Sequence, residues 1–125
     1  MAQTILLVDD DRTNLIATKT LLTQQGHMMA TAQNGQDAVT ACMKNSFDII
    51  LMDLIMPTMD GFATVESIRT LERQKMLNPA YIIALTAFTH SDYREKCAKT
   101  EIDDFFPKPY KPEELIRKIQ SVCCV

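Results

Sequence analysis

Short apolar runs alternate along the chain with longer polar segments that carry an apolar stripe. The runs are typical of strands buried on both faces, and the striped segments are typical of amphipathic helices. The predicted strands are residues 5–8, 28–32, 48–52, 81–85 and 105–106. The predicted helices are residues 13–25, a segment opened by Asn34-Gly35, a segment around 65–71, residues 92–99 and a segment that begins near Pro112.

The apolar positions of the predicted helices indicate which faces are buried. In chain order these positions are Leu15, Ile16, Leu21 and Leu22, then Ala38, Val39, Cys42 and Met43, then Val65, Ile68 and Leu71, and finally Leu115, Ile116, Ile119 and Val122. Gly26 is a typical helix stop, and Pro112 suits the first turn of the last helix. We therefore expect each helix to pack one stripe against a central sheet.

Five alternations of strand and helix predict an α/β fold, because parallel strands need helical crossovers. Right-handed crossovers leave few arrangements, and five units suit a doubly wound parallel sheet of order 2-1-3-4-5, a flavodoxin-like three-layer sandwich. The chain shows no internal repeat or linker, so we expect residues 1–125 to form a single domain.

Composition narrows the class of protein. The 125 residues include 13 basic and 16 acidic side chains, with a net charge of −3 and 46% hydrophobic residues. This is globular composition, without an apolar run of membrane-spanning length or a signal peptide. A net acidic domain is poorly suited to a phosphate backbone, so we expect no direct nucleic-acid or membrane partner. We expect a cytoplasmic protein whose four cysteines are reduced, because their spacing fits no zinc site.

Polar residues follow the predicted strands at their carboxyl ends, where ligands bind in such folds. Asp9 and Asp10 follow the first strand, Asp53 the third, Thr86 the fourth and Lys108 the fifth. Converging carboxylates repel one another unless a cation lies between them. Carboxylate oxygens suit Mg²⁺, which is also commonly bound together with phosphate oxygens. Asp11 is interpreted as a helix cap.

Several of these stretches resemble the response-regulator receiver domain (CheY-like) of two-component phosphorelays. The similar stretches are residues 5–11, 34–39, 47–53, 56–61, 82–87 and 108–109, and the most specific is Met56-Pro57-Thr58-Met59-Asp60-Gly61. Asn14 and residues 103–109 are most similar to receivers of hybrid sensor kinases, which favours a piece of a larger protein.

The resemblance implies a role for each site residue. Asp53 would be the nucleophile that accepts a phosphoryl group and becomes an aspartyl phosphate. Asp9, Asp10 and Asp53 would hold Mg²⁺ together with the backbone carbonyl of Ile55. Lys108 would pair with one phosphoryl oxygen, and the Thr86 hydroxyl would bind another.

The resemblance also implies partners and an output. The donor would be a histidine kinase or a histidine phosphotransfer protein, and the downstream effector is unknown. Thr86 and Phe105 would act as the switch, with Phe106 on the opposite face of the strand. The surface that changes would comprise the fourth helix, fifth strand and fifth helix, a natural place for a phosphorylation-dependent homodimer. The isolated domain would not be a turnover enzyme. The resemblance leaves open whether the parent chain is a hybrid histidine kinase.

Two features depart from the family pattern. Residues 99–102 stand where related receivers often have a glycine turn, so the shape of this connection is open. Pro107 lacks a backbone donor, which is acceptable mainly on an edge strand.

Three other classes of protein share some of these features. Residues 9–13 fit the Asp-x-Asp-x-Thr pattern of haloacid-dehalogenase-like phosphatases, with Asp9 as nucleophile, but this leaves Asp53 unexplained. A flavodoxin needs donors rather than three acids in its first loop. A receiver-shaped module without phosphate chemistry has no support, because every required side chain is present.

Overall fold

The computed structural model describes residues 2–54, 60–86, 99–108 and 110–123 of the chain. Its five parallel strands are β1 (Thr4–Val8), β2 (Met28–Ala32), β3 (Ile49–Asp53), β4 (Tyr81–Thr86) and β5 (Asp104–Pro107). They form one sheet of order β2-β1-β3-β4-β5, which confirms the predicted topology. The helix predicted at residues 92–99 falls almost entirely outside the described residues.

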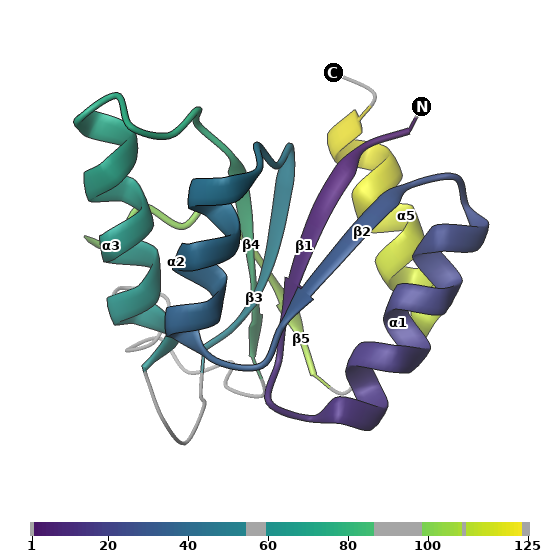
Figure 1. Cartoon of the computed structure of the whole chain (residues 1–125). Coiled ribbons are helices and arrows are strands. Elements are labelled where there is room, and N and C mark those ends of the chain that lie inside the picture. The colour runs from purple at the N-terminus through teal and green to yellow at the C-terminus, as the bar shows by residue number, and fades with distance from the viewer. Residues whose placement is uncertain (1, 55–59, 87–98, 109, 124–125) are drawn as a thin grey trace.

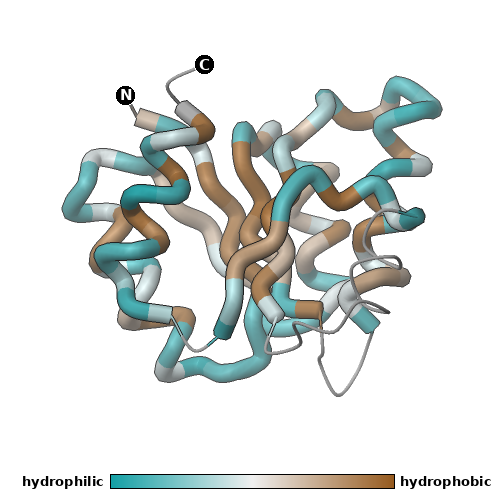
Figure 2. Tube along the Cα trace, turned by 180° about the vertical axis from the view of Figure 1, so that it is seen from behind, coloured by the Kyte–Doolittle hydropathy of each residue, from teal (hydrophilic) through white to brown (hydrophobic). Residues whose placement is uncertain are grey.

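Two layers of helices cover the sheet, as Figure 1 shows. One face carries α2 (Gly35–Lys44) and α3 (Gly61–Arg73), and the other carries α1 (Arg12–Gln24) and α5 (Pro112–Cys123). In Figure 2 the strands between these layers are predominantly hydrophobic, and hydrophilic residues lie on the outer sides of the helices. No helix in the described parts of the chain has the length and apolar character to cross a membrane.

Short polar side chains start three of the helices. Asp11 accepts hydrogen bonds from the backbone N–H groups of Thr13 and Asn14, so it caps α1 as predicted. Asn34 caps α2, and Asp60 caps α3. Each cap satisfies a donor that the first turn of a helix would leave unpaired. The helices therefore begin immediately after the loops at the carboxyl ends of the strands.

The buried stripes differ from the prediction at two positions. Ile16 is 59% exposed, and the buried residues of α1 include Thr18 beside Leu15 and Leu22. Met43 is 58% exposed, although Cys42 is buried as expected. Consecutive helical residues point about 100° apart. Because each helix packs a narrow stripe on the sheet, Leu15 and Cys42 reach the core while their neighbours Ile16 and Met43 face outward.

The edge strand β5 fits its unusual sequence. Pro107 lies at its end on the outer edge of the sheet, as predicted for a residue without a backbone donor. The side chains of the two phenylalanines lie on opposite faces. Phe106 packs with the core between the sheet, α1 and α5, whereas Phe105 is 38% exposed.

A buried arginine links α3 to the segments that precede β4 and β5. The Arg69 guanidinium donates to the backbone carbonyls of Ala80 and Glu101, at 2.8 and 2.9 Å. It also forms ion pairs of 2.7 Å with both Glu72 and Asp103. Glu101 has a φ of 61°, in the left-handed region that favours glycine. The connection at residues 99–102 thus makes its turn with Glu101, whose carbonyl oxygen Arg69 holds.

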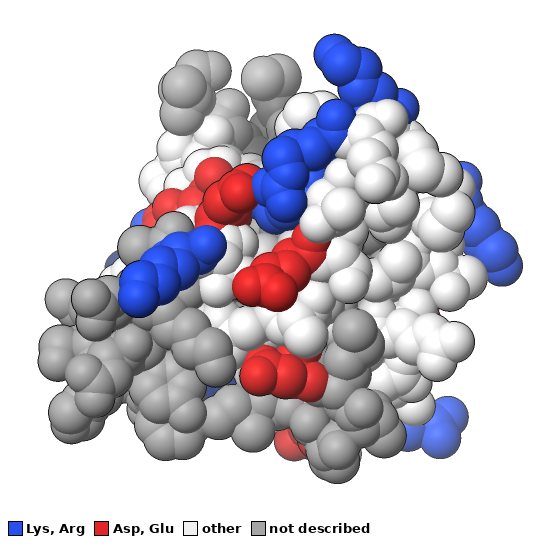
Figure 3. Space-filling view, turned by 90° about the vertical axis from the view of Figure 1, so that its left-hand side faces the viewer, with Lys and Arg blue, Asp and Glu red and all other residues white. Residues whose placement is uncertain are grey.

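Charges of both signs are interleaved on the face that carries α3. Figure 3 shows acidic side chains next to basic ones among the coloured residues. One such contact is the exposed ion pair between Arg73 and Glu101, at 2.6 Å. Exposed pairs of this kind contribute little to stability, whereas breaking a buried pair leaves the remaining charge buried without its partner.

Replacing Arg69 with methionine is therefore expected to lower the free energy of unfolding by about 3 kcal/mol. The matched control is Arg73→Met, which removes an exposed ion pair on the same helix and is expected to cost less than about 1 kcal/mol. Urea unfolding of the two variants measures the difference. Equal losses would show that the Arg69 contacts do not fasten α3 to the sheet.

Candidate functional site

The strand register brings together residues that are far apart in the sequence. Val8 pairs with Met52, so Asp9, directly after β1, and Asp53, the last residue of β3, occupy neighbouring positions. Thr86 at the end of β4 pairs with Pro107, which precedes Lys108. Because all five strands are parallel, these positions lie at the same edge of the sheet, the one formed by the carboxyl ends of the strands.

Three carboxylates meet at this edge. One oxygen from each of Asp9, Asp10 and Asp53 lies within 4.8 Å of the others. Asp9 and Asp53 are buried, and Asp10 is exposed. The Lys108 ammonium lies 3.2 Å from Asp9 Oδ2 and 3.4 Å from Asp53 Oδ2. Three acids and one lysine leave a formal charge of minus two, which one divalent cation would neutralise.

Asp9 keeps its negative charge although it is buried. Burial alone raises the pKa of its carboxyl, but three donors outweigh burial and lower the pKa below its ordinary value. Oδ1 accepts a 2.9 Å hydrogen bond from the backbone N–H of Asp11. Oδ2 accepts a 2.6 Å hydrogen bond from the side-chain amide of Asn14, and it also faces Lys108. This carboxylate is thus held in a fixed orientation.

Lys108 is the positive counterpart of the acids. Burial lowers the pKa of its ammonium, but the charges of Asp53 and Asp9 outweigh burial and raise the pKa above the ordinary value. Its backbone N–H donates to the carbonyl of Thr86 at 2.8 Å, which anchors the residue just beyond the edge strand. Lys108 therefore stays protonated and bridges the two buried carboxylates.

The other predicted residues have different outcomes. Thr86 is buried at the end of β4, at the same edge as the acids. Phe105 lies on β5 and is half-exposed, so it does not fill the core in this structure. The carbonyl of Ile55, predicted to bind the metal, lies outside the described residues. The switch role of Thr86 and Phe105 stays a prediction.

Asn14 contacts the cluster directly and Tyr110 contacts it through Asn14, and neither residue was assigned a role from the sequence. Asn14 donates to Asp9 from the first turns of α1 and also donates to the Tyr110 hydroxyl, at 3.2 Å. Asn14 was marked in the sequence only by its resemblance to hybrid-kinase receivers and by its place five positions after Asp9, and Tyr110 only by its place two positions after Lys108. Side-chain hydrogen bonds between such segments depend on the packing of α1 against β5 and α5.

Gly61 allows α3 to begin against the end of β3. A Cβ atom at this position would lie 2.5 Å from the backbone oxygen of Asp53 and 2.5 Å from the Cα of Leu54. The Gly61 N–H also donates to the Leu54 carbonyl at 3.0 Å. The glycine of the Met56–Gly61 motif is thus required by a close backbone approach directly behind Asp53.

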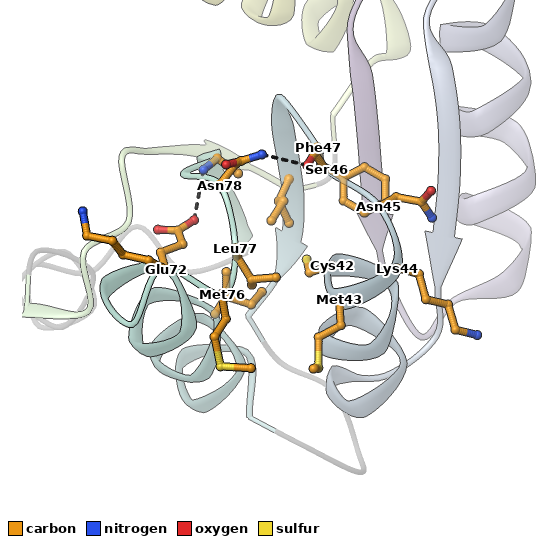
Figure 4. A pocket seen from close by; sticks show the side chains of 14 residues that line it. Cys42, Met43, Lys44, Asn45, Ser46, Phe47, Glu72, Met76, Leu77 and Asn78 are labelled. Atoms are coloured by element: carbon orange, nitrogen blue, oxygen red, sulfur yellow. Dashed lines mark hydrogen bonds between the residues drawn. The ribbon is translucent and has the colours of Figure 1, made fainter.

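A pocket of about 190 Å³ lies elsewhere, between the last turns of α2 and α3 (Figure 4). Its lining includes Phe47 and Ala80, which precede β3 and β4, so it opens at the amino ends of these strands. The carboxylates lie at the opposite ends. This pocket is separate from the acidic cluster.

Comparison with known proteins gives the family. The sequence model of the response regulator receiver domain matches residues 5–120. The chain therefore belongs to the response regulator receiver domain family. This is the receiver class of two-component signalling systems, and a haloacid-dehalogenase-like phosphatase is not supported.

Individual relatives agree with this assignment. The chain is 33% identical to the sensor protein GacS of Pseudomonas syringae pv. syringae over 118 residues, which cover 94% of this chain and 13% of that protein. It is also 33% identical to the receiver domain of the sensor histidine kinase PA1611 from Pseudomonas aeruginosa, with a TM-score of 0.82 and 97% of each chain covered. The chemotaxis protein CheY4 of Vibrio cholerae is 28% identical, with a TM-score of 0.89 and coverage of 98% of this chain and 99% of CheY4.

The chain is homologous to the receiver domains of sensor histidine kinases. It spans 6–15% of the length of the first histidine kinases that it matches. The PA1611 receiver structure contains a magnesium ion coordinated in its active site cleft. In the present chain, the acidic cluster of Asp9, Asp10 and Asp53 has the ligand atoms for a metal ion.

Gly61→Ala is expected to displace the end of β3 and to lower the free energy of unfolding by about 1–3 kcal/mol, because the new methyl group meets backbone rather than a movable side chain. The control is Gly26→Ala. Gly26 has a φ of +93° but no atom within 4 Å of a Cβ, so only backbone strain is expected there. Amide NMR shifts of Asp53 and Leu54 should change in the Gly61 variant alone. Unchanged shifts there would contradict the close approach.

Proposed function

We propose that this domain is a Mg²⁺-dependent phosphoacceptor in which Asp53 receives the phosphoryl group. The observation that carries the proposal is the position of Asp53: a buried carboxylate paired with Lys108 and close to two further acids. A buried carboxylate with a fixed lysine is pre-organised for a reaction that brings in negative charge. Residues 1–125 form a single receiver domain in this proposal.

The ligand atoms fit magnesium better than a softer metal. The cluster offers carboxylate oxygens, and no sulfur or imidazole ligand belongs to it among the described residues. Asp9, Asp10 and Asp53 would hold the ion together with the backbone carbonyl of Ile55. The ion would supply positive charge that neutralises the acids and the incoming phosphoryl oxygens. The magnesium in the PA1611 receiver supports this choice.

The covalent step is an in-line displacement at phosphorus. A carboxylate oxygen of Asp53 forms the new P–O bond as the P–N bond of a phosphohistidine breaks. The bonding electron pair stays on the imidazole nitrogen, which takes up a proton from solvent. Lys108, 3.4 Å from Asp53, is placed to pair with one phosphoryl oxygen, and the Thr86 hydroxyl would bind another. The protein thus contributes positioning and charge neutralisation.

The donor in this proposal is a histidine kinase or a histidine phosphotransfer protein, supported by the similarity to receivers of sensor kinases. The parent chain would then be a hybrid histidine kinase, whereas the domain alone would only catalyse its own phosphorylation and dephosphorylation. The downstream effector is left open.

The output would be a repacking at the edge of the sheet. Thr86 would move towards the bound phosphoryl group, and Phe105 would turn inward from its half-exposed position on β5. A phenylalanine has no hydroxyl, so its signal would pass through packing alone. The altered face would comprise the segment of residues 92–99, β5 and α5. Such a face suits a phosphorylation-dependent homodimer.

Incubation with acetyl phosphate and Mg²⁺ is expected to add the mass of one phosphate to the domain. Asp53→Asn should abolish the addition because the nucleophile is lost. Asp9→Asn should slow it while leaving the phosphate on Asp53, and Glu66→Gln is a control for loss of one exposed acid. Intact-mass spectrometry with peptide mapping measures these outcomes. Phosphate found on Asp9, or persisting in Asp53→Asn, would refute the assignment.

Mg²⁺ should also stabilise the protein, by about 2.7 kcal/mol at one hundred times its dissociation constant. Asp10→Asn is expected to raise the metal-free free energy of unfolding by about 0.5 kcal/mol, because one repulsive charge is removed. The same variant should lose most of the gain from Mg²⁺. Urea unfolding with and without the ion tests both signs, with Glu66→Gln as the control. If Mg²⁺ stabilises Asp10→Asn as much as the native protein, Asp10 is not a ligand.

A further inference from the structure

A chain of hydrogen bonds runs from the Asp9 carboxylate to the connection between β5 and α5. The Asn14 amide nitrogen donates one hydrogen to Asp9 Oδ2, at 2.6 Å, and the other to the Tyr110 hydroxyl, at 3.2 Å. The Tyr110 hydroxyl in turn lies 3.1 Å from the hydroxyl of Thr18, which is 2% exposed. Both hydrogens of one amide group are therefore engaged, which fixes its rotation and excludes its flipped orientation.

Tyr110 is itself held in place. Its ring meets Phe106 edge to face, with ring centroids 6.0 Å apart and an interplanar angle of 61°. It belongs to the core layer between the sheet, α1 and α5. The hydroxyl therefore has little freedom to follow a moving Asn14. It provides a fixed acceptor on one side of the amide, with Asp9 on the other.

Asp9 Oδ2 has two competing donors, and this makes the orientation of Asn14 important. The same oxygen lies 3.2 Å from Lys108 Nζ. If the Asn14 amide rotated away, the carboxylate would lose its shortest hydrogen bond and would keep only the Asp11 N–H on Oδ1 and the lysine on Oδ2 among these contacts. Groups that fix a metal-ligating carboxylate in this way influence metal affinity even though they do not touch the ion.

We propose that Tyr110 is a positioning residue of the phosphoacceptor site: its hydroxyl fixes the Asn14 amide, and Asn14 fixes the Asp9 carboxylate for Mg²⁺. The part that concerns Mg²⁺ rests on the proposed function. The link from Tyr110 through Asn14 to Asp9 consists of side-chain contacts alone, so it can be tested without Mg²⁺. A merely structural Tyr110 would stabilise the β5–α5 connection without acting through Asn14.

The first test uses the metal-free protein. Tyr110→Phe removes the hydroxyl and keeps the ring on Phe106. It is expected to shift the NMR signals of the Asn14 side-chain amide and the Asp9 carboxylate carbon. The matched control is Tyr81→Phe, which removes a partly buried hydroxyl that lies 3.5 Å from Asp104. Unshifted Asn14 and Asp9 signals in Tyr110→Phe would overturn the proposal.

The second test is a double-mutant cycle on Mg²⁺ affinity, measured by calorimetry. Asn14→Ala is expected to weaken binding about tenfold, and Tyr110→Phe about three- to tenfold. The double variant should bind as weakly as Asn14→Ala alone, because Tyr110 acts through Asn14. If Tyr110→Phe weakens binding equally in the Asn14→Ala background, or has no effect, the positioning role is wrong.

The two proposals can fail separately. A native protein that neither binds Mg²⁺ nor accepts phosphate on Asp53 contradicts the proposed function, while the metal-free NMR comparison still decides the Tyr110–Asn14–Asp9 link. The free energy of unfolding is measured for every variant. Asn14→Ser replaces Asn14→Ala in the cycle if the alanine variant does not fold.

Discussion

One electrostatic constraint governs the candidate site: two buried carboxylates share a single lysine at the carboxyl ends of parallel strands. Asp9 and Asp53 both contact the Lys108 ammonium, and the exposed Asp10 adds a third negative charge nearby. Hydrogen bonds and the lysine keep Asp9 ionised, but three acids and one lysine leave a net negative charge among the described residues of the site. This net negative charge attracts a divalent cation and so favours a reaction that such a cation assists.

Several parts of the fold position the residues of this site. The register of β1, β3 and β4 sets the spacing of the acids and Thr86. Gly61 lets α3 start against the backbone behind Asp53. Arg69 secures the far end of α3 to the segments that lead into β4 and β5, and so keeps the edge strand that precedes Lys108 in place. Regions distant from the carboxylates thus determine where the carboxylates lie.

Local patterns predicted the elements better than they predicted individual burial. The residues of β2 agree with the predicted strand, and the helix caps were visible in Asp11 and in the Asn34-Gly35 pair. The burial of Ile16 and Met43 was predicted wrongly, because an apolar side chain shows no preference for one neighbour of a stripe until the helix is docked. Thr18 lies on the docked face of α1 although it is polar, and its hydroxyl contacts the Tyr110 hydroxyl there.

Three features could be read from the sequence without the fold: the alternation of strands and helices, the order of the sheet, and the acids and lysine at the carboxyl ends of the strands. They follow from periodicity, chain connectivity and strand ends. How those side chains are held became visible only in the packed molecule. The Asn14–Tyr110 contact spans 96 positions, and the Arg69 contacts join α3 to residues up to 34 positions away. Such contacts leave no local signal, because their partners meet only after the helices have packed on the sheet.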